Sequence, residues 1–288
     1  MAYDVEKNAI KGGTLYLVTT PIGNLADLSE RAVKTLSEVD FIAAEDTRNS
    51  SRLLSYLDIH KPMVSYHDHN RRERGEELVE RLLAGESCAL ITDAGTPGIS
   101  DPGEDMVALC AEKGILVTLI PGPCAAISAL VLSGLSTGKF IFEGFLPAKP
   151  TERRARLRDL ASETRTVIYH EAPHKLKATL SDMKDAFGGD RRISLCRELT
   201  KLNEEIFRTT LDGAVERYSD AEPRGEYVLV VDGAKNSASS VFWTDMDEVA
   251  HVDHYISLGM SKNDAIKAAA KDRGVPKNEV YKKVIDNK

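Results

Sequence analysis

The most informative stretch of the chain is ALITDAGTPGISDPG, residues 89–103. Its first part, Ala89–Thr92, is a short apolar run of the kind found in buried strands. The next eleven residues, Asp93–Gly103, contain three glycines and two prolines, and a helical pattern begins at Glu104. Glycine lets the backbone approach a ligand closely, and proline fixes the path of a loop. Because open α/β sheets bind ligands at the carboxyl ends of their strands, this stretch predicts an α/β fold with a ligand-binding loop.

Two further loops with glycine and proline follow predicted strands in the same half of the chain. Thr19–Leu25 comes after the strand-like run Thr14–Thr19, and Pro121–Pro123 separates the predicted strand Val117–Ile120 from the predicted helix Ala125–Leu132. Each loop alone is also what a tight turn requires. Three such loops at the strand ends of one sheet converge, so together they predict a small-molecule pocket.

Strand-like and helical patterns alternate along the first half of the chain, which predicts a largely parallel sheet with helices on both faces. The second half alternates in a similar way. Its strand-like runs Ile193–Cys196 and Ile206–Thr210 are close enough for a hairpin, so we expect the second sheet to be mixed. The other predicted strands are residues 41–44, 140–145, 167–169 and 227–231, and helical patterns cover residues 28–39, 53–57, 78–83, 104–113, 152–160 and 175–186.

Composition divides the chain into two α/β domains and a tail. Residues 146–150 hold two prolines, so we expect an N-terminal domain of residues 1–146 and a second domain of residues 147–234. The small polar residues 234–240 have the composition of a linker. Residues 235–288 are therefore expected to form a linker and a small helical tail.

Charge divides the tail into two parts. Residues 241–258 carry four acidic side chains and no lysine or arginine, whereas residues 259–288 carry eight basic and four acidic ones, a net charge of +4. In the basic part, Asn263–Arg273 and Lys277–Ile285 have helical patterns, and Gly274 lies between them. A basic helix–turn–helix of this kind is typical of nucleic-acid contact. A small helical appendage packed on another surface explains the same pattern.

Composition also restricts the class of protein. The 288 residues are 42% hydrophobic and 29% charged, the balance of a globular chain. The net charge of −7 argues against a surface that is basic all over, although positive charge can still gather locally. No apolar run approaches the roughly 18 residues of a membrane span, residues 1–13 hold no apolar signal segment, and the four cysteines are scattered singly. We therefore expect a cytoplasmic protein with no membrane contact.

The known metal and nucleotide motifs are absent or unsuitable. The chain contains neither GxxxxGK[ST] nor GxGxxG after the first strand. His170–His174 matches the letters HExxH, but the two histidines of such a zinc site must lie one turn apart on one helix. A strand-like run precedes His170, and Pro173 suits only the first turn of a helix. We expect no metal there, and we expect Tyr66–His69 to be a solvated loop.

A set of segments carries a resemblance to a known superfamily. In chain order, across residues 13–234, they are Pro21–Leu25 with Asp27 and Ser29, Ala44–Arg48, Asp93–Gly103, Pro121–Pro123, Phe142–Pro147, Glu171–His174, Arg197–Lys201 and Gly225–Val228. Together they resemble the tetrapyrrole methylase superfamily, and Ala44–Arg48 and Arg197–Lys201 resemble its ribosomal-RNA branch. The resemblance implies two α/β domains with S-adenosylmethionine in the cleft between them, a homodimer, and methylation of the 2′-hydroxyl of a cytidine in the decoding centre of 16S ribosomal RNA.

The same resemblance implies site residues. Those expected to hold S-adenosylmethionine are Pro21, Ile22, Gly23, Gly95, Thr96, Ile99, Ser100, Cys124, Ala125 and His170. A ribose hydroxyl is a weak nucleophile near neutral pH, which favours a general base. The carboxylate candidates, which the sequence does not rank, are Glu45, Asp46, Asp93 and Glu198. A salt bridge or a helix cap explains each of them equally well. The candidates to contact RNA phosphates, or to neutralise these carboxylates, are Arg48, Arg197 and Lys201.

Two basic segments are candidates for wider contact with 16S ribosomal RNA or the small ribosomal subunit. They are residues 149–165, with a net charge of +3, and the basic part of the tail. Both are also compatible with solvated helix faces. Two rival functions stay open. A methyltransferase for a tetrapyrrole-like small molecule gives the basic tail no role, and a non-enzymatic RNA-binding regulator leaves the three convergent loops unexplained.

Overall fold

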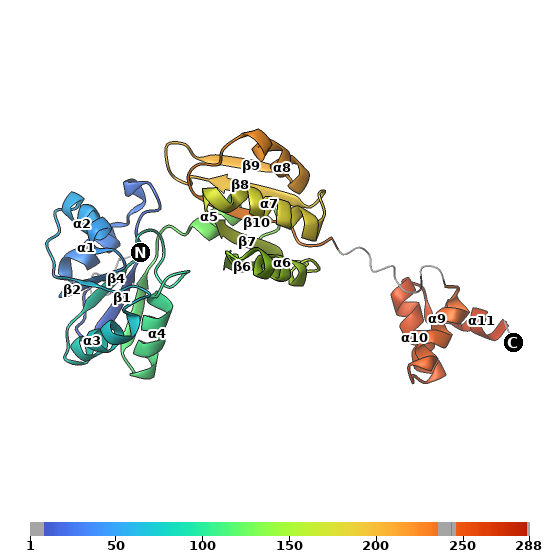
Figure 1. Ribbon diagram of the computed structural model, residues 1–288. Helices are drawn as coiled ribbons and strands as arrows, with labels where there is room; N and C mark the ends of the chain where they lie inside the picture. The colour runs from blue at the N-terminus through green and yellow to red at the C-terminus, as the bar shows by residue number, and fades with distance from the viewer. Residues whose placement is uncertain (1–8, 236–242, 244–245, 287–288) are drawn as a thin grey trace. The chain divides into compact units, whose positions relative to one another are not determined.

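The first sheet of the protein is parallel throughout. The computed structural model describes residues 9–235, 243 and 246–286 (Figure 1). The strand order of the first sheet is β3-β2-β4-β1-β5. The strands are β1 (Thr14–Val18), β2 (Phe41–Ala44), β3 (Met63–Ser65), β4 (Cys88–Ile91) and β5 (Leu116–Ile120). All neighbouring pairs run in the same direction, so the predicted parallel sheet is confirmed. The sequence does not predict β3, because three half-buried residues make too short an apolar run.

Helices cover both faces of this sheet, as predicted. Leu15 and Leu17 belong to a core cluster that includes residues of α3 and α4, whereas Tyr16 and Val18 belong to a cluster that includes residues of α1 and α2. Successive strand residues point to opposite faces, so a strand buried on both faces must be apolar throughout. The helices are α1 (Glu30–Glu38), α2 (Thr47–Tyr56), α3 (Arg71–Leu83) and α4 (Gly103–Glu112), and a short 3-10 helix, η2 (Leu25–Asp27), precedes α1.

The second sheet contains both parallel and antiparallel strands, which confirms the predicted mixed sheet. Its order is β6-β7-β10-β8-β9. β6 and β7 run parallel, while the other neighbours, including the expected β8–β9 hairpin, are antiparallel. The strands are β6 (Phe140–Phe145), β7 (Thr166–Glu171), β8 (Arg192–Arg197), β9 (Glu205–Thr210) and β10 (Tyr227–Val231).

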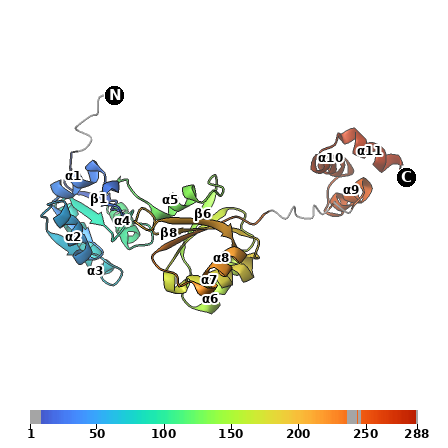
Figure 2. The ribbon, with the colours of Figure 1, turned by 90° about the horizontal axis from the view of Figure 1, so that it is seen from above.

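Helices also cover both faces of the second sheet (Figure 2). Tyr169 and Leu229 pack in a cluster with residues of α6, α7 and α8, whereas Ile168 and Val230 pack against α5. The helices are α5 (Ala125–Leu132), α6 (Pro150–Asp159), α7 (Pro173–Phe187) and α8 (Leu211–Asp220). The sequence patterns do not predict α8, which follows β9 directly.

The domain boundary expected at residues 146–150 is wrong. One helix and one strand that precede it, α5 and β6, belong to the second domain. β6 ends at Phe145, yet it pairs with β7 in the second sheet. The helix before it, α5, buries Ala126, Ala129 and Leu130 against that same sheet. The chain therefore passes from the first sheet to the second at Pro121–Pro123, directly after β5. One of the two prolines that suggested a boundary, Pro150, has a local cause, because it is the first residue of α6, where a missing N–H costs nothing.

Residues 234–288 form a compact unit of their own, apart from residues 1–233. Its described part contains α9 (Glu248–Ser257), α10 (Lys262–Arg273) and α11 (Lys277–Asp286). α10 and α11 confirm the predicted helix pair, and Gly274 ends α10 with a φ of 65°, a conformation that favours glycine. The sequence does not predict α9, which adds Val252 to the core of the pair and makes a three-helix unit.

Two expectations concern residues that the structure does not describe. The predicted linker lies outside the described residues from residue 236 onward, and so do the first eight residues of the polar N-terminal segment. Among the helices of the described residues, none is long and apolar enough to cross a lipid bilayer.

Candidate functional site

The three predicted ligand loops meet at one edge of the first sheet. β1 lies between β4 and β5, so the carboxyl ends of these strands are adjacent. Thr20 and Gly95 exchange two backbone hydrogen bonds, of 2.9 and 3.1 Å. The hydroxyl of Thr96 donates to the carbonyl oxygen of Pro123 at 3.1 Å. The predicted convergence of the loops is therefore confirmed.

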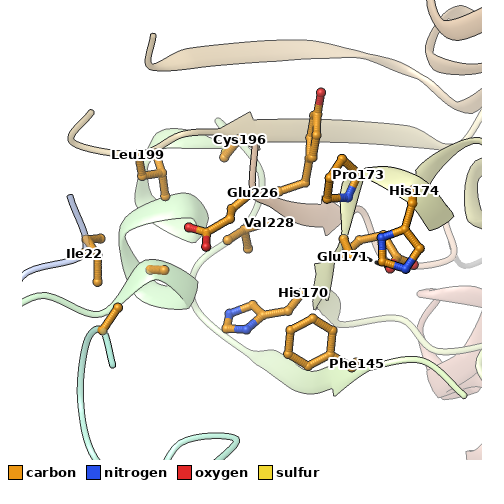
Figure 3. Close-up of a pocket in the computed structure, with 14 residues that line it drawn as sticks. Ile22, Phe145, His170, Glu171, Pro173, His174, Cys196, Leu199, Glu226 and Val228 are labelled. Atoms are coloured by element: carbon orange, nitrogen blue, oxygen red, sulfur yellow. Dashed lines mark hydrogen bonds between the residues drawn. The ribbon is translucent and has the colours of Figure 1, made fainter. Parts of the chain in front are cut away.

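The loops after β1 and β4 form one side of a cavity of about 490 Å³, a size typical of small-molecule sites. Elements of the second sheet form the other side (Figure 3). The lining includes Ile22 and Ala94 from the loops after β1 and β4, and His170, Glu171, Glu226 and Val228 from β7, β10 and the residue before β10. The cavity thus lies between the two α/β domains, where residues of both reach a ligand.

His170 brings an unsatisfied polar atom to this cavity. Its ring stands edge-to-face between the rings of Phe142 and Phe145, with centroids 5.2 and 5.3 Å away. Nε2 is buried and has no hydrogen-bond partner in the part of the chain that the structure describes. Burial lowers the pKa of His170, so the ring is neutral at neutral pH. A buried polar atom without a partner costs about 1–3 kcal/mol, and a ligand that bonds to it removes this cost.

Three of the residues predicted to hold the cofactor line the cavity, namely Ile22, Ala125 and His170. Pro21 and Gly23 border a smaller cavity of about 200 Å³. Asp93, one of the candidate bases, borders it too. The loop after β1 therefore separates the two spaces and reaches both.

The other predicted cofactor residues shape the loops around the cavity. Gly95 has a φ of 86°, and a Cβ on it would be only 3.3 Å from Cγ2 of Ile22. Ser100 also has a positive φ, of 65°, and its hydroxyl oxygen would lie 3.5 Å from a Cβ on Gly144. Thr96 makes the hydrogen bond to the Pro123 carbonyl, Cys124 is the N-cap of α5, and the side chain of Ile99 is exposed. None of these five residues is among those that line the cavity, so their contact with the cofactor stays a prediction.

Glu45 and Asp93 lie side by side at the ends of β2 and β4. The backbone N–H of Asp93 donates to Oε2 of Glu45 at 3.5 Å, and Nδ2 of Asn49 donates to Asp93 Oδ2 at 3.2 Å. Burial raises the pKa of Glu45, and the negative charges of Asp93 and Asp101 act in the same direction. Within the described residues, Glu45 has no salt bridge. A carboxylate with a raised pKa and no paired cation has the properties of a general base.

Asp46 has a structural role at the start of α2. As the N-cap, it accepts a hydrogen bond from the backbone N–H of Arg48 at 2.8 Å. Its two oxygens also accept from the guanidinium of Arg48, at 3.1 and 2.8 Å. These hydrogen bonds lower the pKa of Asp46 to about 2, which makes it a weak base. The side chain of Arg48 stays 87% exposed.

Glu198 and Lys201 belong to a tightly held loop after β8. Nζ of Lys201 is 2.8 Å from Oε1 of Glu198 and 2.8 Å from Oε2 of Glu226. The hydrogen bond from Lys201 is the main reason why the pKa of Glu198 is lowered. Glu198 and Thr200 have φ values of 52° and 66°, which non-glycine residues rarely adopt unless the surroundings hold them there. Glu198 therefore anchors the loop.

The three predicted RNA-contacting cations neutralise carboxylates, one of the two roles that the sequence left open. Arg48 pairs with Asp46 and Lys201 with Glu198, as described above. Arg197 Nε lies 3.8 Å from Glu205 Oε2. The side chains of Arg197 and Lys201 are each 29% exposed, so Arg48 is the cation with most surface left for an RNA phosphate.

Sequence reasoning misses several residues that reach the cavity from the second sheet. They are Phe145, Glu171, Cys196, Leu199 and Glu226. A signal for them existed, because all except Cys196 lie in the segments that carry the superfamily resemblance. Their strand and turn patterns predict burial, but a pattern along one strand does not tell which end faces the other domain.

The basic segment of residues 149–165 is not a free basic surface. Arg153 is buried and, together with Arg154, binds Asp182. The other ion pairs of the segment are Lys149–Glu152, Arg156–Glu143 and Arg165–Glu163. Five of its six cations are therefore paired with carboxylates, although only Arg153 is buried, and RNA contact at this segment stays a prediction.

The HExxH letters do not form a helical zinc motif. His170 lies in β7, and His174 lies in the first turn of α7, which begins at Pro173. The two rings therefore cannot lie one turn apart on a single helix face.

Comparison with known proteins assigns the fold to a family. A family model described as Tetrapyrrole (Corrin/Porphyrin) Methylases matches residues 14–215. The chain belongs to this family. Two relatives are named Ribosomal RNA small subunit methyltransferase I. The protein from Halalkalibacterium halodurans is 48% identical over 271 residues, which are 93% of this chain and 93% of that protein. The protein from Bacillus subtilis is 45% identical over 272 residues, with the same coverage. The superfamily resemblance seen in the sequence is thereby confirmed.

Solved structures show the same methylase fold. Uroporphyrin-III C-methyl transferase from Thermus thermophilus, complexed with S-adenyl homocysteine, has a TM-score of 0.54 at 18% identity, covering 76% of this chain and 97% of that one. Diphthine synthase has a TM-score of 0.58 at 14% identity, covering 76% and 90%. At such identities the likeness concerns the fold, and it confirms the predicted α/β architecture.

Proposed function

We propose that this methylase transfers a methyl group from S-adenosylmethionine to the 2′-hydroxyl of a cytidine in 16S ribosomal RNA. The observation that carries the proposal is the match to proteins named Ribosomal RNA small subunit methyltransferase I, which extends over 93% of this chain and of its Halalkalibacterium halodurans relative. A match of that extent reaches beyond the two α/β domains into the tail. The proposed partner is the 16S RNA, free or within the small ribosomal subunit.

The cavity between the domains fits S-adenosylmethionine. Its volume of about 490 Å³ suits a ligand of that size, and its wall near Ala94 and Ala125 is built of small side chains that let a ligand approach the backbone. Nε2 of His170, which has no hydrogen-bond partner among the described residues, offers a polar contact to the ligand, and the ring of Phe145 offers apolar surface. A neutral imidazole also avoids repulsion of a sulfonium charge.

S-adenosylmethionine supplies a methyl group that is already activated by its sulfonium. The protein must therefore orient the ribose hydroxyl in line with that methyl and remove its proton. We propose that Glu45 accepts the proton of the ribose hydroxyl, because Asp46 and Glu198 are bound by cations and have lowered pKa values, whereas the pKa of Glu45 is raised. Asp93 stands next to Glu45 and positions it through the backbone contact of 3.5 Å. Arg48, with its exposed guanidinium beside this pair, is placed to bind a phosphate of the target strand.

A cytoplasmic homodimer is the proposed working form. Support for a dimer comes from exposed apolar side chains along α5 and the edge strand β5. They are Leu116, Leu119, Ile127, Val131 and Leu132. Monomeric proteins rarely leave large apolar patches in water, so a second copy is a suitable cover. Mass measurement in solution tests this part, and a monomer at micromolar concentration would contradict it.

One assay tests the proposed activity against its rivals. The protein is incubated with methyl-labelled S-adenosylmethionine and with small ribosomal subunits, bare 16S ribosomal RNA or a porphyrin precursor. Label in the RNA, at the 2′-position of a cytidine after nuclease digestion, is the expected result. Label only in the porphyrin precursor would favour the tetrapyrrole alternative, and RNA binding without any label transfer would favour a non-enzymatic regulator.

A further inference from the structure

Leu202 is the most exposed large apolar side chain among the described residues. Its relative exposure is 99%, whereas the next values are 69% for Tyr56 and 68% for Val131. A single exposed leucine is ordinary on a protein surface. Leu202, however, follows Lys201 directly and so belongs to the strained loop between β8 and β9.

The backbone on both sides of Leu202 is held in one conformation. The N–H of Lys201 donates to the carbonyl of Glu198 at 3.0 Å, and the N–H of Glu204 donates to the carbonyl of Lys201 at 3.1 Å. The N–H of Thr200 donates to Oε2 of Glu204 at 2.6 Å. The loop therefore presents Leu202 from a fixed base, and burying this side chain against a partner costs little backbone entropy.

This loop also borders the cavity. Leu199 and Glu226 line it, and Lys201 holds the loop to Glu226 through the 2.8 Å contact. The aliphatic part of the Lys201 side chain also contacts the first domain. It lies against Gly23, next to the lining residue Ile22. Leu202 thus directly follows the residue that contacts both Gly23 of the first domain and the lining residue Glu226.

A cytidine stacked in folded RNA cannot bring its ribose into such a cavity unless its contacts with neighbouring bases are opened. Enzymes that act on one nucleotide move it out of the stack, and apolar side chains that insert between bases compensate part of the lost stacking. We propose that Leu202 inserts beside the target cytidine and holds its neighbouring bases apart. The inference rests on the proposed function, because it takes RNA as the substrate.

The experiment compares Leu202→Ser and Leu202→Met with a matched control, Leu83→Ser. Leu83 is 62% exposed at the end of α3, away from the cavity lining. Methyl transfer is measured at varied concentrations of small ribosomal subunits, and the Kd for S-adenosylmethionine is measured separately. We expect Leu202→Ser to lower kcat/KM for the subunits about 10- to 100-fold, the effect of losing one fully buried leucine. Leu202→Met should stay within about threefold, since methionine is apolar and of similar volume.

The possible results separate the two proposals. If the unmodified protein does not label the subunits, the proposed function fails, and the role of Leu202 fails with it. If the unmodified protein is active and Leu202→Ser matches Leu83→Ser, the proposed function stands and the inserted leucine is refuted. If Leu202→Ser changes the mass of the protein in solution, the side chain contacts a second copy of the chain, which also overturns the inference.

Discussion

The side-chain stem of Lys201 lies directly against Gly23. A Cβ built on Gly23 would be 2.3 Å from Cγ of Lys201, a distance that real atoms do not reach. Gly23 belongs to the loop after β1, and Lys201 belongs to the loop after β8, so this contact joins the two α/β domains beside the cavity. The same lysine binds Glu198 and Glu226, and any displacement of its stem therefore disturbs the cavity wall.

Substitution of Gly23 by alanine is expected to impair methyl transfer. The new Cβ must displace Lys201, and a φ of +147° also disfavours an L side chain. A misplacement of about 1 Å near the reacting groups can cost roughly 100-fold in rate, so we expect kcat/KM to fall about 10- to 100-fold. Steady-state kinetics with small ribosomal subunits measures the effect.

Gly85→Ala is the matched control for Gly23→Ala. Gly85 also has a positive φ, of 98°, but a Cβ built on it would meet no atom within 4 Å. This variant should lose stability without losing activity. In a Lys201→Ala background, Gly23→Ala should cause a smaller further loss, because the contact with Lys201 is gone while the unfavourable φ and the approach to Thr200 Oγ1, at 3.1 Å, remain. Strictly additive losses would show that the contact has no functional role.

Glu45→Gln tests the proposed general base. Loss of a general base typically costs 10²- to 10⁴-fold in rate, so kcat should fall by about that factor while the Kd for S-adenosylmethionine is unchanged. Burial raises the pKa of Glu45, so the activity of the unmodified protein should rise with pH as this group loses its proton. The rise should be absent in Glu45→Gln. An intact rise in Glu45→Gln, together with its loss in Asp93→Asn, would transfer the role to Asp93.

His170→Phe tests the polar contact in the cavity. Phenylalanine keeps the ring between Phe142 and Phe145 but removes Nε2. Loss of one neutral hydrogen bond, about 1 kcal/mol, should raise the Kd for S-adenosylmethionine about fivefold. Calorimetric titration measures this change. An unchanged or lower Kd would mean that the ligand does not use Nε2.

Asp182→Ala is expected to destabilise the second domain by about 3–5 kcal/mol, because it leaves the buried Arg153 without a counter-charge. Arg153 and Asp182 are only 7% and 6% exposed, at a distance of 2.6 Å. Burial alone raises the pKa of Asp182, but the hydrogen bonds from Arg154 and Arg153 outweigh it, and the pKa is lowered. The stabilisation is therefore present at neutral pH and is lost as the pH falls through this lowered value. Denaturant unfolding at pH 7 measures it. The exposed Asp185, on the same helix, is the control, and an equal loss in Asp185→Ala would refute the assignment.

Deletion of residues 236–288 should weaken binding to 16S ribosomal RNA and leave S-adenosylmethionine binding unchanged. In the described part of the tail, Lys262, Lys267, Lys271 and Lys282 are exposed. In contrast, Arg273 donates to backbone carbonyls within the unit, and Lys283 pairs with Glu248. Each lost phosphate contact should reduce the slope of log K against log salt concentration by about 0.7–0.9. The double variant Lys267→Gln and Lys271→Gln, which keeps the fold, should reproduce part of the change. RNA affinity that is the same with and without the tail would exclude this role.

Much of the fold could be predicted from local patterns. The alternation of apolar strands and amphipathic helices predicts the parallel first sheet, and the spacing of Ile193–Cys196 and Ile206–Thr210 predicts the hairpin. β3 escapes prediction because it is only three residues long, whereas α8 and α9 escape it although each is ten residues long and holds several apolar residues. The segment Asp93–Gly103 could be predicted to lie at the site, because its glycines and prolines indicate a loop of fixed shape that a ligand can approach closely. This signal lies within one short stretch of sequence.

The fold class, the converging loops and the family can all be inferred from the amino-acid sequence alone. Three other features become known only from the packed chain: β6 joins the second sheet, cations hold Asp46 and Glu198 but none of the described residues pairs with Glu45, and Lys201 reaches Gly23. The physical reason is the same in each case. Periodicity reports what a residue does within its own strand or helix, whereas pairing, pKa and cavity lining depend on atoms that are distant along the chain and become neighbours only after the sheets have packed.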